Sequence, residues 1–233
     1  MEYNQNVSPL ELGQVGAASR NKVMRNTYLL LALSMIPTVL GAWLGVATGL
    51  SAAMLTSPGI TFIIFMAGAF GFIYAIEKNK ESGLGVGLLL AFTFFMGVML
   101  SRLIGMVLGM SNGASLVGIA FGGTAIIFFS MAALGTVIKR DLSGLGKFLM
   151  IGAWVVFFGA ILSYFVQMPM FTVVLCVMVI AIFSLYMLYD VNKVVQGGET
   201  NYISATLQLY LDIYNVFQAL LALLSIFGGG NRN

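Results

Sequence analysis

The sequence predicts an all-α integral membrane protein of seven transmembrane helices, with the last helix at the centre of the bundle. The first observation is composition, because 60% of the 233 residues are hydrophobic and only 8% are charged, whereas about 25% are charged in ordinary soluble domains. The second is a series of seven apolar segments, each near the 20 residues or so that span a bilayer as a helix. The third is a polar stripe along the last segment, which a membrane helix must turn towards protein or water.

The apolar segments succeed one another with short connections. Their predicted bounds are 28–50, 59–76, 84–108, 116–138, 145–166, 170–189 and 202–227. The chain therefore divides into a polar N-terminal tail (1–26) without a signal-peptide core, a membrane domain (27–228) and a short C-terminal tail (229–233). The Gly105-x-x-x-Gly109 and Gly118-x-x-x-Gly122 patterns fit close approach between membrane helices.

Positive charge alternates along the connections and predicts the topology. Connections 51–58, 109–115 and 167–169 contain no lysine or arginine. The opposite side carries nine such residues: Arg20, Lys22, Arg25, Lys78, Lys80, Lys139, Arg140, Lys147 and Lys193. By the positive-inside rule the N-terminus and the charged connections are cytoplasmic, and seven spans then place the C-terminal tail outside.

Composition also excludes several classes of function. The formal net charge of +3 is small and scattered, so no nucleic-acid partner is expected. Histidine is absent and Cys176 is the only cysteine, so we predict no resident cofactor and no cysteine- or histidine-ligated metal.

Asp212 lies near the middle of the last apolar segment. Steps of three or four residues put it on one helical stripe with other polar side chains, namely Asn201, Ser204, Gln208 and Asn215. An aspartate at this depth costs about 2.5–3.5 kcal/mol on insertion scales and so marks a functional site. The alternative is a buried hydrogen-bonding residue that fixes helix packing.

Asp190 closes the preceding segment, whose helix should continue through Lys193 and stop at Gly197-Gly198. Because two consecutive antiparallel helices carry the acids at similar depths, Asp190 and Asp212 can meet. Two carboxylates about 4 Å apart repel by about 4 kcal/mol at an effective dielectric of about 20. The pair would then share a proton near neutral pH and, when ionised, offer oxygen ligands to Ca²⁺. The alternative for Asp190 is an interfacial ion pair with Lys193.

Four further residues complete the candidate site. Gln208, Asn215 and Tyr189 are candidate pore-lining residues. Arg102, in the third segment, either extends its side chain to the membrane interface or acts as counter-ion to an internal acid.

The sequence resembles the Bax inhibitor-1 (TMBIM) family, and most closely its bacterial YccA-like branch. The residues that carry the resemblance are Lys22–Tyr28 (KVMRNTY), Phe121–Ala125 (FGGTA), Lys139–Ser143 (KRDLS), Ser184–Asp190 (SLYMLYD), Gly197–Ile203 (GGETNYI), Leu209–Asn215 (LYLDIYN) and Leu224–Gly228 (LSIFG). The resemblance covers essentially the whole membrane region.

This resemblance implies a seven-helix bundle and a pH-sensitive calcium leak controlled by an aspartate pair, which falls here on Asp190 and Asp212. For the YccA-like branch the resemblance implies an alternative function. The protein would be a modulator and slow substrate of the membrane AAA+ protease FtsH, bound through the N-terminal tail. The resemblance also implies a bacterial inner membrane. Some leak-competent members have an arginine near the inner end of the second helix that can engage the acids. This chain reads Tyr74-Ala-Ile-Glu-Lys78 there, without an arginine, so the sequence does not identify the residue that gates the acids.

An enzyme is a third possible function. Aspartyl intramembrane proteases also carry two aspartates on consecutive helices, the first in a Tyr-Asp pair. Here the second acid stands in Leu209-Tyr-Leu-Asp212, without the Gly-x-Gly-Asp or the Pro-Ala-Leu of those enzymes. We therefore predict that the protein is not an enzyme.

Overall fold

The computed structural model describes residues 9–166 and 168–228, and every regular element in this part of the chain is a helix. The helices are α1 (Pro9–Ala47), α2 (Leu50–Thr56), α3 (Pro58–Lys78), α4 (Gly83–Leu108), α5 (Gly113–Val137), α6 (Ser143–Val166), α7 (Pro169–Val195) and α8 (Tyr202–Gly228). Within the described residues, seven helices are long and apolar enough to cross a membrane, α2 being the exception. The predicted fold class is confirmed.

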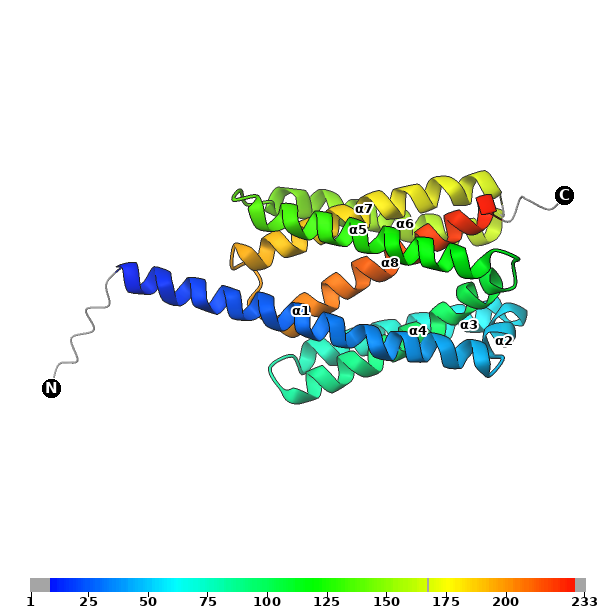
Figure 1. Ribbon diagram of the computed structural model, residues 1–233, viewed down its shortest axis with the longest axis horizontal. Helices are drawn as coiled ribbons and strands as arrows, with labels where there is room; N and C mark the ends of the chain where they lie inside the picture. The colour runs from blue at the N-terminus through cyan, green and yellow to red at the C-terminus, as the bar shows by residue number, and fades with distance from the viewer. Residues whose placement is uncertain (1–8, 167, 229–233) are drawn as a thin grey trace.

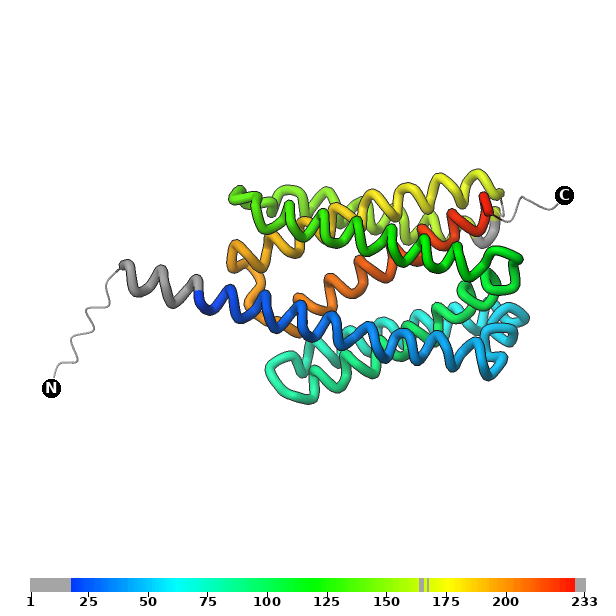
Figure 2. The backbone as a smooth tube through the Cα atoms, viewed as in Figure 1, coloured from blue at the N-terminus to red at the C-terminus, as the bar shows by residue number. Residues whose placement is uncertain are grey.

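Helix α8 occupies the centre of the bundle, as the polar stripe predicted. Figure 1 shows it, coloured orange to red, running obliquely between a group formed by α1 to α4 and a group formed by α5 to α7. It packs against α1, α3, α4, α5 and α7, whereas α6 packs on α7 at the periphery. The tube in Figure 2 follows the same path, with the chain crossing from one group to the other between α4 and α5.

Two element boundaries differ from prediction. α1 begins at Pro9 rather than near residue 28. Proline is favoured in the first turn of a helix, and no further proline interrupts the chain before Pro37. Helix α2 was not expected inside the first uncharged connection. Gly49, with φ of 75°, ends α1 and turns the chain into it. Residues 1–8 and 229–233 of the two predicted tails lie outside the described residues.

Glycines bring two helix pairs into backbone contact, α1 with α4 and α5 with α7. A Cβ built on Gly97 of α4 would collide with the carbonyl oxygen of Thr38 in α1. A Cβ on Gly135 of α5 would lie 2.8 Å from the carbonyl oxygen of Leu188 in α7. By contrast, a Cβ on Gly118 or Gly122 would meet no described atom within 4 Å, so the prediction of close approach there was wrong. Periodicity locates a small-residue stripe but not the face that a partner helix takes.

Candidate ion and proton site

The connection between α7 and α8 determines how the two acids are presented. Gly197 has φ of 80°, a left-handed conformation that favours glycine. The backbone N–H of Gly198 donates to the carbonyl of Lys193 at 2.8 Å, and that of Gly197 donates to Val194 at 3.0 Å. These bonds satisfy carbonyls at the end of α7. The predicted stop at this glycine pair is confirmed, and the chain reverses within a few residues.

Asn201 starts α8 and fixes it to a second connection. Its Oδ1 accepts from the backbone N–H of Ile203 at 2.8 Å and of Ser204 at 3.2 Å, which caps the helix. Its Nδ2 donates to the carbonyl of Lys80 at 2.9 Å, in the connection between α3 and α4. A hydrogen bond from Lys80 to the Glu77 carboxylate, at 3.0 Å, raises the pKa of Lys80. The N-terminus of α8 is thus hydrogen-bonded to the connection between α3 and α4.

Asp190 and Asp212 meet across the α7–α8 interface. Asp190 is 6% exposed and Asp212 is 4% exposed, and their carboxyl groups lie within hydrogen-bonding reach of each other. At 1.5 Å per residue, Asp190 lies about 8 Å inside the end of α7 and Asp212 about 15 Å inside the start of α8. The two acids that the sequence singled out are therefore brought together inside the bundle.

Two carboxyl groups can hydrogen-bond only when one of them carries a proton. The Asp212 Oδ2 atom is buried and makes no hydrogen bond to any described residue. Both groups are buried, and like charges at this range repel strongly where water is scarce. Two carboxyl groups in this arrangement can share one proton.

A polar cluster made of Lys193, Glu199 and Gln208 covers the pair on the side of the charged connections. Lys193 Nζ lies 3.8 Å from Glu199 Oε2, and the same oxygen accepts from Gln208 Nε2 at 3.4 Å. The expected alternative, in which Lys193 pairs with Asp190, is replaced by this pair with Glu199. The charge of Lys193 still acts on Asp190. Sequence analysis did not identify Glu199, because the contact of its carboxylate with Lys193 and Gln208 depends on the geometry of the α7–α8 connection.

A tyrosine that the sequence analysis did not select accompanies the acids. Tyr186 lies close enough to Asp190 and Asp212 to interact electrostatically with both. Tyr189, the predicted lining residue, packs its phenol ring onto Gly146 of α6 and lies edge-on to Tyr186, 6.5 Å between ring centroids. Tyr186 stands four residues before Asp190, a spacing that shares a helix face and could have identified it.

The two remaining candidates make no hydrogen bond or ion pair with the acids among the described residues. Asn215 is half-buried, and its Nδ2 donates to the carbonyl of Leu211 in its own helix at 2.8 Å. Arg102 is exposed near the opposite end of α4, about 9 Å from the end of the helix at Leu108. Neither ion pair of the described residues includes it. Its position supports the expectation that the side chain extends to the interface.

The site's donor set suits a passing cation better than a tightly held one. Within the described residues, no cluster of three or more acidic, cysteine or histidine side chains could hold a metal. Ca²⁺ takes six to eight oxygen ligands, and the pair supplies at most four carboxylate oxygens. An ion at the pair would therefore keep part of its water.

Comparison with known proteins extends over nearly the entire chain. A sequence profile described as inhibitor of apoptosis-promoting Bax1 matches residues 20–232. A protein of Neisseria meningitidis serogroup B is 36% identical over 212 residues, which cover 91% of this chain and 93% of the relative. The modulator of FtsH protease YccA from Escherichia coli K12 is 35% identical over 215 residues, which cover 92% of this chain and 93% of the relative. The sequence from Escherichia coli O6:H1, with the same identity and coverage, is named inner membrane protein YccA.

Proposed function

Because this chain belongs to the Bax inhibitor-1 family of membrane proteins, we propose that it is a cation leak, chiefly for Ca²⁺, controlled by the Asp190–Asp212 pair. The observation that supports this proposal best is the meeting of two buried carboxyl groups inside a membrane bundle. An acid in this position carries a large cost, and a purely structural role would be served as well by an amide.

Protonation supplies the control in this proposal. With one shared proton the pair carries a single negative charge; with none it carries two and attracts a divalent cation, because Ca²⁺ prefers carboxylate oxygen. The Lys193–Glu199–Gln208 cluster lies between the pair and the charged end of the bundle. Its ion pair is partly exposed, so separating it costs little, about 1 kcal/mol or less.

Ca²⁺ flux into proteoliposomes tests the proposal. Asp190→Asn and Asp212→Asn keep the shape of the side chain and remove one ionisable group each. Either substitution should reduce the flux about tenfold or more, because the affinity of a site for Ca²⁺ falls when it loses a charged ligand. Asp141→Asn is the matched control, since Asp141 is an exposed acid that bonds Ser143 at the start of α6. Equal flux in all four proteins would remove the acid pair from the mechanism.

A second candidate function is modulation of an FtsH-type protease in a bacterial inner membrane, with the charged connections cytoplasmic. It is favoured by the Escherichia coli relative, which is named a modulator of FtsH protease and matches over 92% of this chain. The continuation of α1 from the first membrane span back to Pro9 offers a handle outside the bilayer.

Removal of residues 1–17 separates the two candidates, because the first membrane span begins at Ala18. Association with the protease, measured by co-purification from membranes, should be lost while Ca²⁺ flux in proteoliposomes is retained. Retained association would place the contact in the membrane domain, and a loss of flux would tie the tail to the leak.

A further inference from the structure

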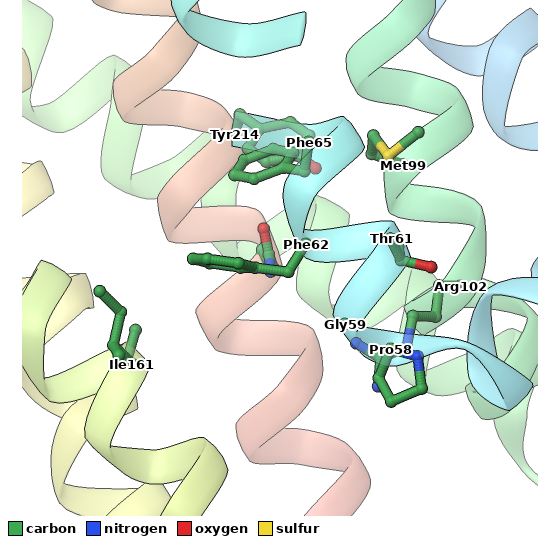
Figure 3. Close-up of a pocket in the computed structure, with 11 residues that line it drawn as sticks. Pro58, Gly59, Thr61, Phe62, Phe65, Met99, Arg102, Ile161 and Tyr214 are labelled. Carbon is green, nitrogen blue, oxygen red and sulfur yellow. The ribbon is translucent and has the colours of Figure 1, made fainter. Parts of the chain in front are cut away.

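A cavity of about 490 Å³ opens between α3, α4, α6 and α8, at the end of the bundle away from the charged connections. Figure 3 shows Arg102 of α4 beside Pro58 and Gly59, the first residues of α3, with Phe62 and Phe65 further along that helix and Ile161 of α6 on the facing side. α8 contributes Tyr214 and Gln218. This cavity is separate from the acid pair, which lies at the α7–α8 interface.

Arg102 is the only charged residue in the sequence from 82 to 138. The short connections around it, at 48–49 and 109–112, carry no acid, and Arg102 joins neither ion pair of the described residues. A guanidinium in the membrane region normally pairs with an acid or a backbone carbonyl, or reaches an anionic headgroup. Among the described residues, Arg102 therefore has no acidic partner.

The rest of the cavity is largely apolar and is open at the surface of the bundle. Its walls are lined by Phe62, Phe65, Met99 and Ile161, and Phe62 is 47% exposed. A cation at one end of an apolar cavity complements a molecule with an anionic head and a hydrocarbon tail. Basic pockets between transmembrane helices bind lipid headgroups on this principle.

We propose that this cavity binds an anionic phospholipid from the leaflet at the uncharged end of the bundle, with its phosphate on Arg102 and an acyl chain along Phe62 and Phe65. An anionic headgroup supplies the charge that matches Arg102, whereas an apolar transmembrane helix of a partner protein would leave the guanidinium unpaired.

A tryptophan placed in the cavity reports the lipid through quenching by brominated acyl chains. The chain has two native tryptophans, Trp43 and Trp154. Replacing both by phenylalanine and adding Phe62→Trp gives a single reporter inside the cavity. Trp154→Phe alone leaves Trp43 as the matched reporter outside this cavity. Trp43 is 62% exposed and lies near the end of α1, at the same end of the bundle.

Each protein is reconstituted in phosphatidylcholine vesicles containing about 10 mol% of brominated phosphatidylglycerol or brominated phosphatidylcholine. One arginine near the membrane surface enriches an anionic lipid about fivefold, so the reporter at position 62 should be quenched several times more by the brominated anionic lipid. Trp43 should be quenched equally by the two. Arg102→Gln should abolish the excess at position 62, and Arg102→Lys should retain part of it, because the charge is kept but the bidentate geometry is lost.

Three outcomes overturn the proposal. Equal quenching of the reporter at position 62 by the two lipids removes the preference for an anionic headgroup. An excess that persists in Arg102→Gln assigns the preference to another residue. Absence of quenching at position 62, with normal quenching at Trp43, means that acyl chains do not enter the cavity.

Discussion

The two buried aspartates are the residues on which the proposed function depends. Placing one charged carboxylate inside a bilayer costs about 2.5–3.5 kcal/mol on insertion scales, and this bundle contains two of them in contact. A shared proton reduces that cost, because it leaves one charge on the pair. The charge of Lys193, itself held by Glu199 at 3.8 Å, offsets part of the remainder. In the proposed mechanism the two carboxyl groups therefore act as one titrating unit.

Tyr186→Phe should shift the pH dependence of Ca²⁺ flux without unfolding the protein. The phenol lies near both carboxyl groups, and losing its hydroxyl removes a polar group that favours the ionised pair. The flux transition should move to higher pH by less than about one unit, which is what a full hydrogen bond would contribute. Tyr189→Phe is the control, since Tyr189 faces Gly146. Identical pH profiles for both variants would argue against a role for Tyr186.

Close contact between α1 and α4 depends on glycine in the structure. Gly97 meets the backbone of Thr38, and Gly41 meets the backbone of Phe94. Apolar burial gives membrane helices no advantage over lipid, so close packing of small residues is a main source of their association. The two helices pack over a long interface, and a side chain at either glycine would force them apart.

Gly97→Ala should destabilise the bundle by about 1–3 kcal/mol, the usual cost of overpacking. The added Cβ meets a carbonyl oxygen of another helix rather than a movable side chain. Gly122→Ala, in an open stretch of α5, should be neutral or stabilising by up to about 1 kcal/mol, because alanine favours the helix. Thermal unfolding in detergent compares the two. Equal midpoints would mean that the α1–α4 contact is looser than the structure shows.

The membrane helices and the acid pair are both predictable from the contrast between apolar and charged residues along the sequence. Long apolar segments indicate the helices, and a charge inside such a segment identifies Asp190, Asp212 and Arg102. Glu199 was not found, because its carboxylate reaches Lys193 and Gln208 only through the fold of the α7–α8 connection. The glycine stripe of α5 was misread because the face that a helix turns to its partners depends on tertiary packing.

The separation of charge between the two ends of the bundle predicts the orientation of the whole molecule. The positive-inside rule predicts that the connection containing Thr200 is cytoplasmic and that the one containing Ser111 is external. Ser111→Cys should therefore react with a membrane-impermeant thiol reagent in intact cells, and Thr200→Cys only after permeabilisation. Both positions are exposed, and the native Cys176 is buried. The reverse labelling pattern would show that the protein has the opposite orientation in the membrane.

The pH dependence of Ca²⁺ flux into proteoliposomes tests the central claim most directly. It should be measured from about pH 6 to about pH 8 for the wild type and for the Asp190→Asn, Asp212→Asn double variant. Flux through the wild type should rise with pH as the pair gives up its shared proton and gains charge for the cation, and the double variant should show no such rise. A pH-dependent flux that survives in the double variant, or no flux at any pH, would contradict an acid-pair gate and leave protease modulation as the better account.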